Sequence, residues 1–376
     1  MTSELSSLCS YAKGKVSVDT LSKRNYVSTE NMMPNKGGIV DAGALPSAQY
    51  TQQYIKDDIL VSNIRPYFKK IWMADDDGGC SNDVLVFRAD RGCDSTFLYY
   101  ILANDAFFNY ASATSKGTKM PRGDKTAIMQ YKVPCFNYET QLRIGKLLRS
   151  IDDRIAVNKK INDNLQQQAF SVFDNLIANA ENNDYTVSDY AFLNPKRTLA
   201  KNQVARSIDM SQLSTSGAFP SGWEMKPFNG GMRFTNGDTL LARITPCLEN
   251  GKTAFIDFLD DGEVAFGSTE YIVLAPKNDT PPEMLYCLAR YPAFVDYAVK
   301  NMNGSSGRQR VSAETVGQYR LPLFDKHSLV LFKEVVSPIF LKMRYNSLEN
   351  MRLAELRDAL LPKLMSGEID VSAVQL

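Results

Sequence analysis

The sequence has little histidine, no paired cysteines and no long apolar run, and each of these absences excludes a class of protein. A single histidine, His327, cannot form a site of several imidazoles, and a Ser-His-Asp hydrolase would depend on it alone. The six cysteines contain no CxxC pair, which argues against a zinc site or a disulfide framework. No apolar run is long enough to cross a bilayer, and the first residues lack the pattern of a secretion signal. We therefore expect a cytoplasmic protein without a membrane segment.

The sequence also lacks an excess of charge of either sign. Its formal net charge is +1, so no overall basic field would attract nucleic acid, and such binding would depend on local clusters. With 44% hydrophobic and 23% charged residues, the composition is that of an ordinary soluble globular protein. A length of 376 residues predicts two or three domains.

A heptad pattern of apolar residues occurs twice, 188 residues apart, which is half of the chain length. The first copy predicts a helix from about residue 139 to 177, and the second predicts a helix that closes the other half. The first seam is Ile144, Leu148, Ile151, Ile155, Asn158, Asn162, Leu165, Ala169, Val172 and Leu176. The second is Phe332, Val336, Ile339, Met343, Asn346, Asn350, Leu353, Arg357, Leu360 and Leu364.

Each seam contains two asparagines, Asn158 and Asn162 in the first and Asn346 and Asn350 in the second. An amide on an apolar seam costs stability unless another amide meets it, so these residues predict pairing across two antiparallel helices in a fixed register. The alternative is that all four face solvent at helix kinks. Apolar residues off the seam would need a partner to cover them, and we expect this surface to include Leu147, Ile161, Phe173 and Ile177.

The globular parts also repeat, with insertions that shift the offset from 180 to 188 residues. Asp58, Leu60, Ile64 and Pro66 match residues 180 positions later, and later matches follow at offsets of 187 and 188. In the first copy we expect a buried strand at 84–87 and a helix at 96–111. The predicted fold class is α+β, with two mixed α/β domains, each followed by a long helix, and the helices paired as an antiparallel coiled coil. The predicted boundaries are 1–138, 139–180, 181–326 and 327–370.

No catalytic constellation is visible in the sequence. Gly251-Lys252-Thr253 resembles the end of a P-loop, but Pro246 occupies the position where the pattern requires glycine. Acidic pairs such as Asp260 and Asp261 could bind a metal for phosphodiester chemistry, but solvated carboxylates in turns are the commoner explanation. We therefore predict no metal site and no cofactor in this chain.

Basic residues among glycine, serine and asparagine are more informative, because such loops can approach a phosphate backbone and present arginine to guanine edges. Two such loops occupy corresponding places in the repeat, and a second basic cluster also recurs roughly. The predicted DNA-binding residues are Lys116, Lys119 and Arg122 in the first loop, Arg308 and Arg310 in the second, and Arg65, Lys69, Lys70, Arg243 and Lys252 in the clusters.

The chain resembles the specificity subunits of type I restriction-modification enzymes. The resemblance rests on the repeated motif Asp58-x-Leu60-x3-Ile64-x-Pro66, on the Pro134 and Pro322 positions before the helices, on 141–176 and, most specifically, on the string from Leu356 to Ile369. One departure is Leu329, which stands where the first copy has Gln141.

This resemblance implies two target-recognition domains that each read half of a split double-stranded DNA sequence. It also implies that the helices set the spacing and dock methyltransferase subunits, which in turn bind the restriction and translocation subunits. Methylation and cleavage, with S-adenosylmethionine, ATP and magnesium, would belong to those partners. An alternative class is a coiled-coil adaptor with duplicated protein-binding modules, and an acidic-cluster nuclease is a third.

Overall fold

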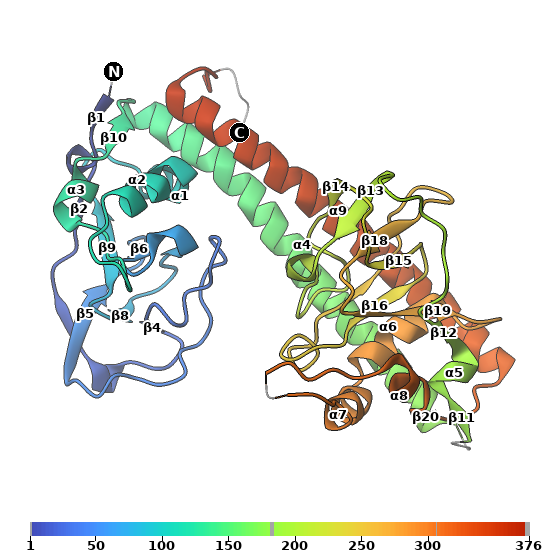
Figure 1. Cartoon of the computed structure of the whole chain (residues 1–376). Helices are drawn as coiled ribbons and strands as arrows, with labels where there is room; N and C mark the ends of the chain where they lie inside the picture. Colours follow the sequence, from blue (N-terminus) through green and yellow to red (C-terminus); the bar gives the residue numbers. More distant parts are fainter. Residues whose placement is uncertain (1, 181–183, 306, 373–376) are drawn as a thin grey trace. The chain divides into compact units, whose positions relative to one another are not determined.

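The computed structural model describes residues 2–180, 184–305 and 307–372, and the chain divides into two compact units. The first unit is Met1–Asp153 with Ala354–Leu376, and the second is Arg154–Leu353. The division falls inside both long helices (Figure 1), so each unit contains one globular module and part of each helix. We call the globular parts the first module, residues 2–137, and the second module, residues 184–325.

Two long helices follow the modules, as the heptad pattern predicts. They are α4 (Tyr138–Ala178) and α9 (Lys326–Ser366), with 41 residues each. Helix α9 ends four residues before the predicted boundary at 370, because Gly367 adopts a positive φ of 76°. The reversed chain then places the Glu368 amide on the Lys363 carbonyl at 3.0 Å, which satisfies a carbonyl of the last turn.

The first module contains two four-stranded sheets. The first sheet has the antiparallel order β2 (Cys9–Tyr11), β9 (Val84–Ala89), β6 (Ile59–Ser62) and β7 (Ile71–Met73). The second has the order β3 (Lys15–Ser17), β5 (Tyr50–Tyr54), β8 (Gly78–Cys80) and β4 (Tyr26–Val27), with β4 parallel to β8. The buried strand expected at 84–87 is thus the first part of β9.

The second module repeats both sheets with one change at an edge. Its first sheet is β12 (Ala191–Leu193), β19 (Tyr271–Pro276), β16 (Thr239–Ala242) and β17 (Thr253–Phe255). Its second is β14 (Glu224–Pro227), β13 (Val204–Ile208), β18 (Ala265–Gly267) and β15 (Met232–Phe234), with β13 parallel to β18. Strands β15, β18 and β13 correspond to β5, β8 and β4, whereas the extra strands β3 and β14 lie on opposite edges.

Short elements complete each module. A two-stranded sheet joins β1 (Thr2–Glu4) to β10 (Lys132–Pro134) in the first module and β11 (Tyr185–Thr186) to β20 (Arg320–Leu321) in the second. The short helices are α1 (Ser95–Ala103), α2 (Asp105–Ala113) and α3 (Lys125–Met129), then α5 (Val187–Tyr190), α6 (Pro282–Arg290), α7 (Pro292–Lys300) and α8 (Ala313–Gly317). The 3-10 turns are η1 (Leu5–Ser7), η2 (Val18–Thr20), η3 (Pro66–Phe68) and η4 (Met210–Gln212).

The prediction of one helix at 96–111 is wrong, because two helices occupy this segment. Asn104 between them is extended, with ψ of 139°, and its side chain accepts a hydrogen bond from the Ala106 amide at 2.9 Å. Asn104 therefore ends α1 and caps α2. The second module breaks at the same place, where Tyr291 is extended before Pro292.

The repeated Asp-x-Leu motif is explained by a buried carboxylate before β6 and β16. Asp58 and Asp238 are each 1% exposed, and each accepts a hydrogen bond from the amide three residues earlier. An arginine pairs with each carboxylate, Arg88 from β9 in the first module and Arg197 from beyond β12 in the second. Burial raises the pKa of Asp238 to about 6, against the attraction of Arg197.

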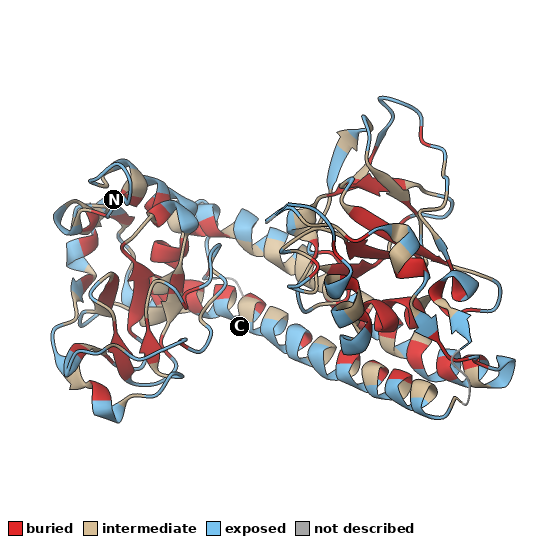
Figure 2. Ribbon diagram, turned by 60° about the horizontal axis from the view of Figure 1, so that its bottom comes forward, coloured by how far each residue is buried: buried red, intermediate tan, exposed pale blue. Residues whose placement is uncertain are grey.

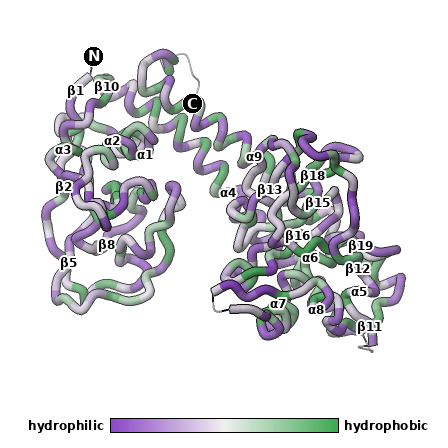
Figure 3. The backbone as a smooth tube through the Cα atoms, in the orientation of Figure 1, coloured by the Kyte–Doolittle hydropathy of each residue, from purple (hydrophilic) through white to green (hydrophobic). Residues whose placement is uncertain are grey.

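The sheets form the cores of the two modules, and the helices join these cores within each unit. Figure 2 colours the strands largely as buried, and Figure 3 shows hydrophobic residues along β16 and α6. In the first unit, Ile144 of α4 and Leu364 of α9 belong to the core of the first module. In the second unit, Phe173 of α4 and Phe340 of α9 belong to the core of the second module. Each module is therefore anchored to both helices.

Candidate nucleic-acid interface

In each module a turn at the end of a buried strand lies beside a basic loop. We call residues 63–70 and 243–250 the strand-end turns, and residues 116–122 and 303–310 the basic loops. In the first module, the Asn63 amide donates to the Asp83 carbonyl at 2.8 Å, and the Arg65 amide donates to the Pro121 carbonyl at 2.8 Å. The loop closes on itself through paired amide-to-carbonyl bonds between Lys116 and Arg122 at 2.8 and 2.9 Å.

The second module repeats this framework bond for bond. The Arg243 amide donates to the Glu270 carbonyl at 3.0 Å, and the Thr245 amide donates to the Gln309 carbonyl at 3.0 Å. Paired bonds of 2.9 Å between Asn303 and Arg310 close the loop. These contacts occur at the offsets of 180, 187 and 188 residues found in the sequence, so the two turns and loops are structural equivalents.

A glycine makes the reversal of each basic loop possible. Gly117 has φ of 97° and Gly304 has φ of 129°, backbone conformations that side chains with a Cβ rarely adopt. A Cβ at Gly304 would also lie 3.1 Å from the Arg308 carbonyl oxygen. The glycines noticed in the sequence therefore allow the chain to reverse in these loops.

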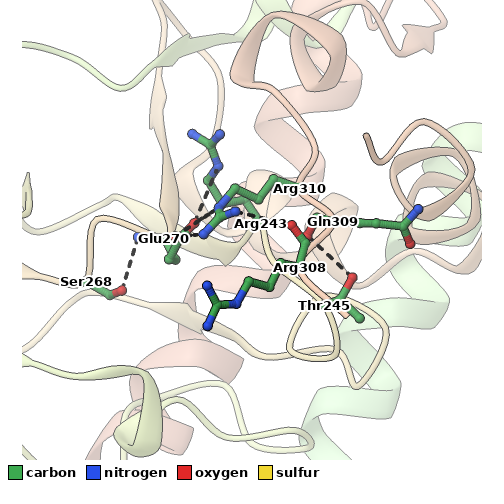
Figure 4. A network of polar contacts seen from close by, with 7 residues as sticks. All are labelled: Arg243, Thr245, Ser268, Glu270, Arg308, Gln309 and Arg310. Carbon is green, nitrogen blue, oxygen red and sulfur yellow. Dashed lines mark hydrogen bonds and ion pairs between the residues drawn. The ribbon is translucent and has the colours of Figure 1, made fainter. Parts of the chain in front are cut away.

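An arginine at the end of each loop is held by a carboxylate from the neighbouring strand connection. In Figure 4 the Arg310 guanidinium lies against Glu270, with Nε and Nη2 donating at 2.6 to 2.9 Å. Arg243 adds a longer contact of 3.9 Å to the same carboxylate. In the first module, Arg122 pairs with Asp83 at 3.0 Å. We call these two pairs the loop braces.

The brace affects the charge state of its carboxylate. The hydrogen bonds from Arg310 are the main cause that lowers the pKa of Glu270, and the nearby charges of Arg310 and Arg243 act in the same direction. Glu270 therefore stays ionised at neutral pH and keeps the loop end in place.

The predicted basic residues differ in whether their side chains have hydrogen-bonding or ionic partners. Seven have partners in their own module: Lys69 with Asp105, Lys70 with the Thr29 carbonyl, Lys116 with Asp124, Arg122 with Asp83, Lys252 with the Met210 carbonyl, and Arg243 and Arg310 with Glu270. Within the described residues, the side chains of Arg65, Lys119 and Arg308 have no hydrogen-bonding or ionic partner. The structure brings Arg65 next to the first basic loop, whereas Lys252 is directed into the second module.

The four seam asparagines lie in the second unit and meet across α4 and α9. The Asn158 amide donates to the Asn350 side-chain oxygen at 3.0 Å, and the Asn346 amide donates to the Asn162 oxygen at 2.8 Å. Asn158 also donates to Glu349 at 2.7 Å. The amides thus face one another rather than solvent, as the antiparallel arrangement requires.

The expected partner surface of α4 is wrong at Phe173. This side chain is 1% exposed and packs edge-on against Tyr291 and Phe332 inside the second unit. Leu147 and Ile177 are half-buried against the cores of their own units, and Ile161 is half-buried on α4. Residues of α4 that lie off the heptad seam are buried or half-buried here because a globular module packs on the two helices.

Sequence reasoning missed the carboxylates of the loop braces and two exposed rings. Asp83 and Glu270 are single acidic residues in strand connections, and only their matching offset of 187 could have identified them. Tyr67 and Phe68 lie in a turn with no apolar periodicity, yet they are 52% and 38% exposed. An aromatic pair between basic residues is the signal that could have found them.

The comparisons with known proteins agree with this architecture. The sequence model of the family described as "Type I restriction modification DNA specificity domain" matches residues 1–167. A protein of Haemophilus influenzae named "Type I restriction enzyme HindI specificity subunit" is 23% identical, and the alignment covers 92% of this chain and 94% of that protein. Over most of its length the chain is thus similar to type I restriction-modification specificity subunits.

Other specificity subunits show the same similarity. The MjaIX specificity subunit of Methanocaldococcus jannaschii is 22% identical, with 74% of this chain and 70% of that protein covered. The crystal structure of an S subunit from M. genitalium has the same fold, with a TM-score of 0.58 at 18% identity and coverage of 97% of this chain and 96% of that one. The expected α+β fold, with two modules and long helices, is thus confirmed.

Two further observations concern a metal and a membrane. Among the described residues of this chain, no group of three or more His, Cys, Asp or Glu side chains is placed to hold a metal ion. None of the helices in the described ranges combines the length and hydropathy that crossing a membrane requires.

Proposed function

We propose that this chain is the specificity subunit of a type I restriction-modification enzyme and reads a split double-stranded DNA target, with each module on one half. The observation that carries the proposal is that one backbone framework presents different side chains in the two modules. Next to the brace, the first loop has Met120 and Pro121 where the second has Arg308 and Gln309. Arginine donates to guanine edges, whereas an apolar side chain contacts the thymine methyl group, so the two loops would select different bases.

The contacts to DNA come from the basic side chains of the turns and loops. Lys119 and Arg308 are exposed, have no partner among the described residues and are available to phosphates or bases, whereas the Nε of Arg65 is buried without a partner beside the first basic loop. Lys116 and Arg122 are 81% and 56% exposed in their ion pairs, so a phosphate can replace their carboxylate partners at little cost. The remaining predicted residues position the turns.

The subunit is non-catalytic, and methyltransferase subunits that bind it supply methylation. S-adenosylmethionine, ATP and magnesium act in those partners and in the restriction subunits that they recruit. For the docking surface we propose α9, where an exposed apolar strip comprises Val330, Leu331, Val335, Leu341 and Tyr345, each between 42% and 58% exposed. At 100° per residue these positions lie on one side of the helix, which suits a second helix.

A binding selection tests the proposed function. The chain purified with its methyltransferase partner is mixed with random duplex DNA, and bound molecules are separated in a gel and sequenced. We expect two short fixed blocks separated by a gap of constant length and variable sequence. The methyltransferase alone is the control and should enrich no such motif. Enrichment of no sequence by the complex would contradict DNA reading and favour the adaptor class, which none of the comparisons supports.

A further inference from the structure

The strand-end turn of the first module exposes two aromatic rings at its tip. Tyr67 and Phe68 form the 3-10 turn η3, their ring centroids lie 4.8 Å apart, and they are 52% and 38% exposed. At the equivalent positions the second module has Cys247 and Leu248, and Leu248 is 1% exposed. The exposed rings therefore belong to the first module alone and are not required by the shared framework.

The backbone around these rings is held in unusual conformations. Arg65 and Lys69, at the two ends of η3, are left-handed, with φ of 50° and 52°. Asn35 and Lys36 are also left-handed, and their amides donate to the carbonyls of Phe68 and Lys69 at 2.8 Å each. Such conformations are uncommon outside glycine and persist only where surrounding contacts impose them. The rings are thus presented by a fixed support rather than a loose loop.

Cations surround the rings. The Nζ atoms of Lys36 and Lys69 both bind Asp105 at 2.9 Å, which ties the turn to α2. Lys70 lies 6.0 Å from the Phe68 ring centre, and burial lowers its pKa although the charge of Glu30 opposes this effect. With Arg65, four cations face two carboxylates, so the surroundings of the rings are positive and suit a polyanion.

We propose that Tyr67 and Phe68 form a wedge that enters the DNA of the first half-site and unstacks one base step. The inference rests on the proposed function, which places the first basic loop on DNA. The Arg65 amide donates to a carbonyl of that loop, so the turn that carries the rings lies beside it. Apolar side chains that insert between base pairs kink the duplex, and pyrimidine–purine steps yield most readily. The first half-site would then be read partly through deformability, and the second only through contacts.

Fluorescence of 2-aminopurine tests the wedge, since this base brightens when it loses its stacking neighbours. The target is first defined by sequencing DNA methylated by the complex, and 2-aminopurine is then placed at each position except the methylated base. The wild-type complex should raise the fluorescence at one step of one half-site only. Tyr67→Ala/Phe68→Ala should abolish that signal and weaken binding by about tenfold.

Two matched variants separate the wedge from a general loss of structure. Tyr50→Ala removes a ring that is 54% exposed elsewhere in the same module and should leave the signal unchanged. Tyr67→Leu/Phe68→Leu keeps an apolar tip and should retain most of it. Specific binding by the wild-type complex without brightening at any step would overturn the wedge but leave the proposed function intact. Absence of specific binding would overturn both.

Discussion

Glu270 shows how a single residue can hold the end of a basic loop in place. It is 26% exposed, receives three hydrogen bonds from Arg310 and lies directly before β19. Removing its charge should therefore release the loop that carries Arg308. The same reasoning applies to Asp83 and Arg122, although their single contact of 3.0 Å is more exposed.

We predict that Glu270→Gln weakens binding to the second half-site by several-fold, because a partly exposed ion pair contributes modestly to loop order. Competition with DNA mutated in either half should show this loss at the second half only. Glu249→Gln, which changes an exposed carboxylate of the strand-end turn in the same module, is the control. Equal losses at both halves would contradict a local role.

The brace should also be insensitive to pH near neutrality. The pKa of Glu270 is lowered in the folded protein, so its contribution is present above the ordinary carboxyl pKa of 4.5 and is lost as pH falls through the lowered value. The affinity difference between wild type and Glu270→Gln should therefore stay constant from about pH 6 to 8.

Arg308 should act on DNA directly. If it contacts a phosphate, Arg308→Ala should reduce the slope of log affinity against log salt by about 0.9. If it reads a base, the variant should instead cost roughly 1 to 3 kcal/mol at one position of the second half-site. Titrations at several salt concentrations distinguish these results, and a variant with neither effect would place the loop away from DNA.

At the scale of elements, periodic segments were predictable and single contacts were not. The heptad seams placed α4 to within one residue at each end, because a 3.5-residue repeat over many turns has few alternatives. The break at Asn104 was missed because capping interrupts the chain without interrupting the apolar pattern. Phe173 was assigned to the wrong surface because a sequence does not show which side of a helix a distant module covers.

The string from Leu356 to Ile369, on which the family resemblance most depends, has a structural explanation. Arg357 of α9 donates to Asp152 of α4 at 2.7 Å, and Asp152 also accepts from the Tyr100 hydroxyl at 2.6 Å. Leu361 and Leu364 enter the core of the first unit beside this network. The end of α9 is therefore fixed to the first module by charge and by packing together.

The proposed docking strip on α9 leads to a test of partner binding. Leu331→Glu/Val335→Glu should prevent the methyltransferase subunit from co-purifying, because two charges would be buried in an apolar contact. The isolated variant should keep its melting temperature, since both side chains are about half exposed. Lys333→Glu, on a different side of the same helix turn, is the control. Full assembly of the double variant would exclude this strip.

For the whole molecule, we propose that the helices determine the gap between the half-sites. Inserting one heptad into both helices keeps the seam in phase and lengthens each by roughly 10 Å at about 1.5 Å per residue. At about 3.4 Å per base pair, the preferred gap should grow by roughly three pairs. Methylation of a library with fixed half-sites and variable gaps measures this preference. An unchanged gap would show that the helices do not set the spacing.

The sequence alone indicated a duplicated α+β protein and its resemblance to a known family, because the repeat offsets and the helix strings extend over most of the chain. The sequence could not predict which bases each module reads. In our proposal these bases depend on a few loop side chains, such as Met120 and Arg308, whose surroundings are created by folding. Because the turns and loops of the two modules share one hydrogen-bonded backbone framework, only a small number of side-chain positions in each module can determine which bases are read.

Independent reading by the two modules is the central claim, and exchange of one module tests it most directly. Residues 185–320 are transplanted into a relative of known target, and the methylated sequence of the chimera is determined by sequencing. We predict that one half of the target changes to the half read by the second module, while the other half stays that of the relative. A change in both halves, or in neither, would contradict the account.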